Sequence, residues 1–200
     1  MMLTHNETSS LVIDTLLGQA YAQNTAVLDL YCEYHAQKEQ SSVNMIGCLL
    51  KQVALRTPKI PDEVTNAFAE SNRGRGQGLQ LAGMLQLFVK VIASIDRVYI
   101  CVDAVDELLP HSRLEFLGAL GQIVQNAPNT RIFLTGKLDI QGGFDRHLTS
   151  GTYIIHNVAN EGDAARYLSH MIDNNRDPGL MTEDLKNDIM KAILEKAPGM

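Results

Sequence analysis

An uninterrupted run of apolar and β-favouring residues, Val98–Val102, leads directly into Asp103 near the middle of the chain. Such a run is typical of a strand buried on both faces, as in a parallel sheet covered by helices. Asp106 and Glu107 follow at once. These acids are therefore expected beyond the carboxyl end of a buried strand, where open α/β sheets place their ligands. No other segment constrains the fold as strongly.

The spacing of the three acids indicates a particular chemistry. An Asp at the end of a strand can bind Mg²⁺, directly or through water, and an adjacent acid can orient a water for attack on a phosphate. The pattern is that of a Walker B strand followed by a second acidic pair. Asp103 is then the candidate metal ligand, and Asp106 and Glu107 are the candidate catalytic acids. The alternative is a core strand followed by a solvated acidic turn; the close D-x-x-D-E spacing favours the Walker B interpretation.

A Walker B strand would be expected to have a phosphate-binding loop upstream, and the sequence contains no G-x-x-x-x-G-K-[ST] motif. The glycine-rich stretch at 74–78 is not followed by Lys-Ser or Lys-Thr and is not preceded by an apolar strand. We predict a surface loop for residues 72–78. The sequence thus carries one half of a nucleotide site.

The amino-acid composition excludes several other classes of protein. Two hundred residues with 45% hydrophobic and 20% charged residues indicate one globular domain, or one domain and the start of another. The net charge of −6 argues against non-specific binding of nucleic acid. The three cysteines lack C-x-x-C spacing and the six histidines are scattered, so we expect reduced thiols, a cytoplasmic location and no zinc site. No apolar run approaches the roughly 18 residues of a membrane span.

Hydrophobic periodicity predicts alternating helices and strands, and therefore an α/β fold with a largely parallel sheet. A capping box, Ser112 with Glu115, predicts the start of one helix, and Asp163 and Thr182 are predicted to cap two more. We expect a nucleotide-binding domain over 1–158 and the start of a helical subdomain over 159–200. The other predicted helices are 8–22, 42–56 and 81–92, and the predicted strands are 25–34, 98–102, 131–135 and 152–156.

With its elements in this order, the chain resembles the NACHT-type signalling NTPases of the STAND class. The resemblance is closest to fungal proteins with a nephrocystin-like nucleotide domain, which are related to heterokaryon-incompatibility proteins. Four parts of the sequence carry it: Leu30–Tyr34 with Ser42–Gln52, Arg97–Glu107, Arg131–Lys137, and Ile154–Leu168 with Glu195–Met200.

This resemblance implies a P-loop NTPase-like fold and a role in signal transduction, as in innate immunity, with Mg²⁺ and ATP or GTP as ligands. It implies that Thr135 and Lys137, at the end of a sensor strand, contact the γ-phosphate. Gly136-Lys137 stands where the family usually has Ser-Arg, which keeps a cation but loses the forked guanidinium. Protein partners or self-association are the expected interactions.

The start of the sequence departs from the family pattern. Ser10–Asp14 resembles the tail of the helix that follows the phosphate-binding loop, which places the Walker A Lys and Thr positions at His5 and Asn6. The preceding strand, central in the family's sheet, would lie before residue 1. We therefore expect a fragment with a gap in its sheet and weak nucleotide binding. Two hypotheses remain: a nucleotide-dependent switch in a form without its phosphate loop, or a degenerate, non-enzymatic interaction module.

Overall fold

The computed structural model describes residues 5–20, 24–56, 60–73, 78–137, 161–173 and 182–196. The chain divides into two compact units, His5–Thr152 and Tyr153–Met200 together with Met1–Thr4. The first unit holds the sheet and all the predicted site residues.

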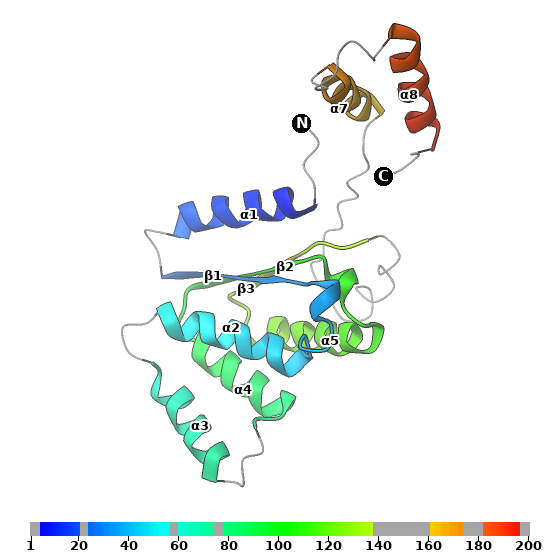
Figure 1. Ribbon diagram of the computed structural model, residues 1–200. Coiled ribbons are helices and arrows are strands. Elements are labelled where there is room, and N and C mark those ends of the chain that lie inside the picture. The colour runs from blue at the N-terminus through cyan, green and yellow to red at the C-terminus, as the bar shows by residue number, and fades with distance from the viewer. Residues whose placement is uncertain are drawn as a thin grey trace. The chain divides into compact units, whose positions relative to one another are not determined.

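Three parallel strands form the sheet of the first unit: β1 (Thr25–Tyr31), β2 (Arg97–Asp103) and β3 (Thr130–Leu134). Their spatial order is β1-β2-β3, so the strand that ends in Asp103 is central (Figure 1). In the register, Asp103 lies beside Tyr31, and Val102 lies beside Leu134. The carboxyl ends of all three strands therefore meet at one edge of the sheet. The predicted parallel α/β fold is confirmed.

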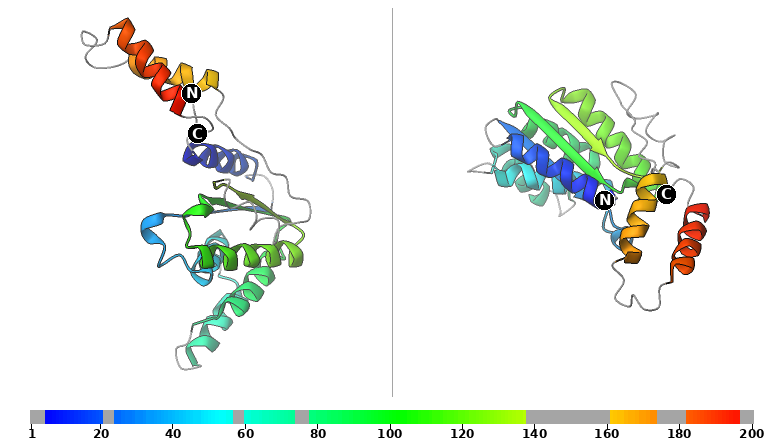
Figure 2. Two further views of the ribbon diagram at one scale, coloured as in Figure 1. Left: turned by 90° about the vertical axis from the view of Figure 1, so that its right-hand side faces the viewer. Right: turned by 90° about the horizontal axis from the view of Figure 1, so that it is seen from above.

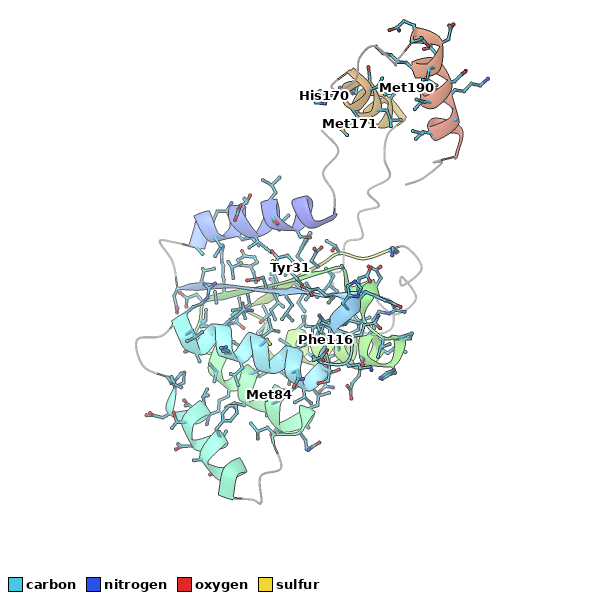
Figure 3. The ribbon with its side chains drawn as sticks, in the orientation of Figure 1. Tyr31, Met84, Phe116, His170, Met171 and Met190 are labelled. Carbon is cyan, nitrogen blue, oxygen red and sulfur yellow. The ribbon has the colours of Figure 1, made fainter. Side chains whose placement is uncertain are left out.

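Helices cover both faces of this sheet. On one face lie α2 (Ser42–Arg56), α4 (Leu81–Ile92) and α5 (Pro110–Asn126), and on the other lies α1 (His5–Ala20), as Figure 1 shows. The larger core lies under the three helices, on the side where Figure 3 labels Met84 and Phe116. The core under α1 is small and consists of Ile13, Val27 and Cys101 with partly buried neighbours.

One helix of the first unit was not predicted. Helix α3 (Asp62–Arg73) begins immediately after Pro61, has two acids in its first turn and packs against α4. Among its described side chains, Val64 is buried and Ala67 is packed against the core at its edge. This sparse apolar pattern explains why periodicity alone did not indicate a helix.

Two predicted helix caps are wrong. Helix α5 begins at Pro110 with Leu109 as its N-cap and no side-chain cap, so Ser112 and Glu115 form no capping box. Proline favours the first helical position because its φ is already helical and it has no N–H to satisfy, which starts the helix before Ser112. Helix α7 (Glu161–Asp173) likewise begins two residues before Asp163. The cap of α8 (Glu183–Lys196) is confirmed, because the Thr182 hydroxyl accepts the Leu185 N–H at 3.3 Å.

Other boundaries differ in detail. Helix α1 (His5–Ala20) begins three residues before the predicted start at residue 8, and β1 ends at Tyr31, before a 3₁₀ turn at Tyr34–Ala36. The predicted strand 152–156 and most of the predicted loop 72–78 lie outside the described residues. Strand β2 pairs directly with both of its neighbours, so the gap expected in the centre of the sheet is not found among the described strands.

In the second unit, α7 and α8 pack against each other (Figure 2). None of the described helices in either unit combines the length and apolar character that crossing a bilayer requires.

Candidate functional site

Asp103 lies at the carboxyl edge of the sheet and is only 3% exposed. Its Oδ1 accepts a hydrogen bond of 2.6 Å from the Ser9 hydroxyl of α1. The same oxygen accepts a hydrogen bond from the hydroxyl of Thr135, which directly follows β3. Three elements that are distant in the sequence therefore converge on one buried carboxylate. Two hydroxyl donors thus satisfy one oxygen of this buried side chain.

Ser9 was not singled out from the sequence. It is 1% exposed and lies one turn before the buried Ile13, so both residues occupy the core-facing side of α1. The sequence signal for Ser9 is a polar residue on the same helical face as core residues. Such a residue is expected to have a hydrogen-bond partner, because buried hydroxyls need one. The identity of that partner was not readable.

Thr135 also organises the turn after β2. Its hydroxyl accepts the Ala104 N–H at 2.9 Å, and its carbonyl accepts the Val105 N–H at 2.9 Å. Ala104 has φ 54°, in the left-handed region that an L-residue adopts at a cost. This turn redirects the chain into a 3₁₀ segment, Val105–Glu107, which carries the two further acids.

Lys137 lies against this second acidic pair. Its Nζ is 3.2 Å from Asp106 Oδ2 and 3.8 Å from Glu107 Oε1, and its backbone N–H donates to Asp106 Oδ1 at 3.2 Å. The Lys137 side chain is 70% exposed, so solvent screens the ion pair and its contribution to stability is at most about 1 kcal/mol. All five predicted site residues thus lie together at one edge of the sheet, although their roles remain predictions.

The buried thiol of Cys32 lies beside the acids. Its backbone N–H donates to the Asp103 carbonyl at 3.0 Å. Burial, together with the negative charges of Asp103, Asp106 and Glu107, raises the pKa of Cys32 to about 12. The thiol is therefore neutral at physiological pH. The contribution of all three carboxylates to its pKa indicates a shared negative potential at this edge.

The oxygen atoms at this edge suit a hard cation that is also bound by another ligand, such as a phosphate. Mg²⁺ is usually bound by one or two carboxylates, with phosphates and water completing its octahedron. Asp103 and the hydroxyls of Ser9 and Thr135 supply oxygens of that kind. Among the described residues, no three His, Cys, Asp or Glu side chains cluster closely enough to hold a metal ion by themselves. The residues therefore fit an open Mg²⁺ site better than a closed protein cage.

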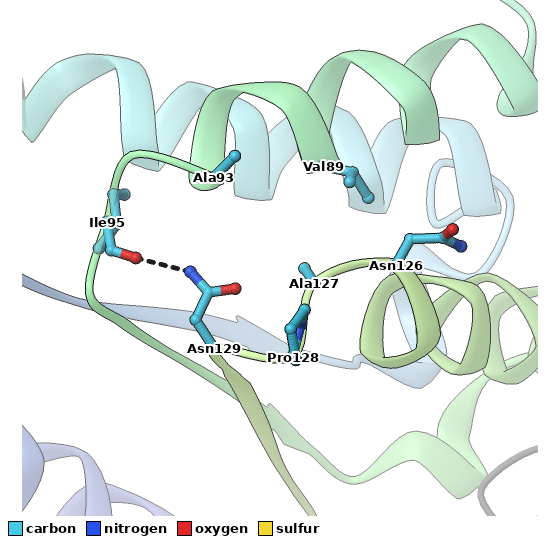
Figure 4. A pocket seen from close by; sticks show the side chains of 7 residues that line it. All are labelled: Val89, Ala93, Ile95, Asn126, Ala127, Pro128 and Asn129. Carbon is cyan, nitrogen blue, oxygen red and sulfur yellow. Dashed lines mark hydrogen bonds between the residues drawn. The ribbon is translucent and has the colours of Figure 1, made fainter.

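Two surface hollows lie at the opposite end of the sheet, near the amino ends of the strands. The first, of about 250 Å³, is shown in Figure 4, where the Asn129 amide points at the Ile95 carbonyl and donates to it at 2.6 Å. The second, of about 300 Å³, is bordered by Thr25 and Arg97 at the start of β1 and β2. Neither hollow contains a residue of the acidic edge, so neither contributes to the site.

Comparison with known proteins bears on this arrangement. Residues 8–137 match the family model described as nephrocystin 3, N-terminal. A solved Walker-type ATPase of Pyrococcus abyssi is similar at 12% identity and a TM-score of 0.42 over 96% of this chain, which spans 63% of the length of that protein. No curated protein matches the chain significantly. Because the family match covers more than half of the sequence, including β1, β2, β3 and the acidic edge, the chain belongs to the nephrocystin 3 N-terminal family.

Proposed function

We propose that the chain is part of the nucleotide domain of a signal-transduction NTPase of the STAND or NACHT type, in which bound ATP or GTP acts as a switch. The observation that carries this proposal is the convergence of Ser9 and Thr135 on the buried Asp103, with a second acidic pair one turn away. Membership of the nephrocystin 3 N-terminal family supports it.

Each residue of the acidic edge has a distinct role in this proposal. Asp103 would hold Mg²⁺, which when bound supplies charge neutralisation to phosphate oxygens. Asp106 or Glu107 would orient the attacking water. Thr135 holds both Asp103 and the backbone of the following turn, so it positions the metal ligand. Lys137 would supply a cation to a terminal phosphate.

Nucleotide binding by this chain is expected to be weak. A phosphate-binding loop contributes backbone N–H donors and a Lys, with charge-assisted bonds of about 1.5–3 kcal/mol each. The sequence contains no such motif. Lacking two or three of these bonds lowers affinity by roughly two orders of magnitude or more. We therefore expect Mg-ATP to bind no tighter than about millimolar and hydrolysis to be negligible in this form.

The same contacts are compatible with the alternative function. Asp103 already accepts two hydroxyl bonds, and Asp106 already pairs with Lys137, so these acids have partners within the chain without any ligand. A non-enzymatic interaction module that binds protein partners or other copies of the chain would need no ligand at this edge.

Titration with Mn²⁺, a paramagnetic substitute for Mg²⁺, tests the two functions against each other. We expect electron paramagnetic resonance to detect ATP-dependent binding of Mn²⁺ to the full chain at millimolar concentration. Asp103→Asn should weaken this binding at least about tenfold, since the ligand charge is lost. Glu107→Gln should spare binding, and the exposed Glu70→Gln on α3 is the matched control.

The outcomes separate the hypotheses. If the wild-type chain binds no Mn²⁺ even with ATP well above the expected millimolar dissociation constant, the nucleotide switch is rejected and the interaction module is retained. Binding that is equal in Asp103→Asn and Glu70→Gln would place the metal elsewhere. Micromolar affinity for Mg-ATP in isothermal titration calorimetry would contradict the expected weakness and require another phosphate-binding segment.

A further inference from the structure

The outer edge of β1, which faces away from β2, is occupied by side chains. The Asp29 N–H donates to Gln52 Oε1 at 3.0 Å, and Gln52 Nε2 donates to the Asp29 carbonyl at 2.6 Å. One side-chain amide thus exchanges two hydrogen bonds with a single backbone residue. A directly opposed residue of an antiparallel strand makes the same exchange.

Two more side chains continue this coverage along the edge. The Arg56 guanidinium donates to the Val27 carbonyl. At the other end of β1, Gln40 Nε2 approaches the Tyr31 carbonyl at 3.5 Å, and Gln40 Oε1 accepts the Glu33 N–H at 3.2 Å. The outward carbonyls of β1, at alternate positions from Val27 to Tyr31, are therefore all engaged.

Helix α2 fixes Gln52 and Arg56 at this edge. Leu49 and Val53, on either side of Gln52, are 0% and 1% exposed and anchor the helix in the main core. Positions 49, 52, 53 and 56 follow the i, i+3, i+4, i+7 spacing of one helical face. The packing of α2 against the sheet thus holds the Gln52 amide level with Asp29, and little side-chain freedom remains to be lost.

Unpaired backbone groups along the outer edge of β1 would favour association between molecules. Its sequence, Thr-Ala-Val-Leu-Asp-Leu-Tyr, contains β-branched, aromatic and other apolar residues, and strands of this kind pair between molecules when their backbone groups are free. We propose that Gln52, assisted by Arg56 and Gln40, acts as a surrogate strand that closes the β1 edge against pairing with a second copy of this chain. The proposal is independent of any nucleotide function.

Replacement of Gln52 by Leu tests this role, because Leu has a similar size but cannot bond to Asp29. We expect Gln52→Leu to self-associate at least ten times more tightly than the wild type in sedimentation velocity over a concentration series. Gln122→Leu, at an exposed glutamine of α5, adds the same apolar side chain to the surface and is the matched control. A Gln52→Leu protein that sediments as the wild type does at every concentration would overturn the proposal.

A second variant distinguishes edge pairing from aggregation through misfolding. Proline is tolerated on an edge strand where its missing N–H would face outward, as the Asp29 N–H does. Adding Asp29→Pro to Gln52→Leu should restore the wild-type sedimentation, whereas persistent association would refute pairing through β1. Hydrogen exchange of the single variant Gln52→Leu tests pairing through β1 without the proline substitution. Protection of residues 25–31 should increase with protein concentration, and protection that does not change would refute the proposal.

Discussion

The bond between Ser9 and Asp103 joins α1 to the central strand, so Ser9→Ala should destabilise the first unit specifically. Both side chains are almost fully buried, and the 2.6 Å bond runs from a hydroxyl to a carboxylate. Hydrogen bonds to charged groups contribute about 1.5–3 kcal/mol, and leaving the acceptor without this donor incurs that loss. Alanine is a better helix former than serine by about 0.5 kcal/mol, which partly offsets the loss.

Ser10→Ala is the matched control, because Ser10 is the next residue of the same helix and is exposed. It receives the same gain in helix propensity without losing the buried bond. We therefore expect Ser9→Ala to unfold about 1.5–3 kcal/mol more easily than Ser10→Ala in urea, monitored by circular dichroism. In thermal melts this difference corresponds to roughly 3–10 °C for a unit of this size.

A double-mutant cycle isolates the charge of the acceptor. Asp103→Asn keeps an acceptor oxygen but removes the charge, so in that background Ser9→Ala should lower the free energy of unfolding by only about 0.5–1.5 kcal/mol. The reasoning fails if Ser9→Ala and Ser10→Ala unfold at the same urea concentration. It also fails if the loss is undiminished in the Asp103→Asn background, because the bond would then not involve that carboxylate.

Four further predictions follow from the geometry and electrostatics of the first unit. Burial raises the pKa of Cys32 to about 12 and that of Cys101 to about 11, whereas Cys48 is exposed. At pH 8 a thiol reagent should therefore modify Cys48 alone. Modification of all three cysteines without denaturant would contradict this prediction. Both pKa values exceed the ordinary thiol pKa of 9.0, so above that pH the unfolded chain releases protons that the folded chain retains. Stability in urea should therefore fall as pH rises from about 9 towards 12. Lys137→Gln removes a positive charge beside Asp106 and Glu107, at the same edge as the proposed metal ligand Asp103. Without ATP it should raise Mn²⁺ affinity up to about fivefold, whereas Lys90→Gln on α4 should not; equal affinities would show that the Lys137 charge does not oppose metal binding. Ala104→Gly should raise the free energy of unfolding by about 0.5–1 kcal/mol, because glycine adopts the left-handed conformation without strain. A destabilised variant would instead indicate that packing of the alanine methyl group contributes more than the backbone strain costs.

Local patterns in the sequence were sufficient to predict the central strand and its acids. An apolar run that ends in Asp103 specifies both the strand and the edge at which its carboxylates emerge, so Asp103, Asp106 and Glu107 could be placed together. Thr135 and Lys137 were placed beside them through the resemblance to a family. The cap of α8 at Thr182 was also local, and it was correct.

The interactions that were missed depend on how elements pack against each other. Ser9 meets Asp103 across 94 positions of sequence, and this contact requires one particular rotation of α1 on the sheet. Gln52 could be recognised as a polar residue among core positions of α2, but its partner Asp29 depends on the height at which the helix crosses β1. The pairing of β2 with β3 likewise depends on the whole sheet, and no local sequence pattern indicated that these two strands would be neighbours.

The direct ladder between β2 and β3 also has a mechanical consequence. Five residue pairs, from Val98 with Thr130 to Val102 with Leu134, would have to separate before any additional strand could enter between them. Insertion of a strand at this position would therefore be slow, because the existing hydrogen bonds must break first. Addition of a strand at an outer edge of the sheet requires no such step. Displacement of β3 would also withdraw Thr135 and Lys137 from the acids, because both follow that strand within three residues. Strand exchange would then also separate the carboxylates from Thr135 and Lys137, and the hydrogen bonds between β2 and β3 would oppose both changes together.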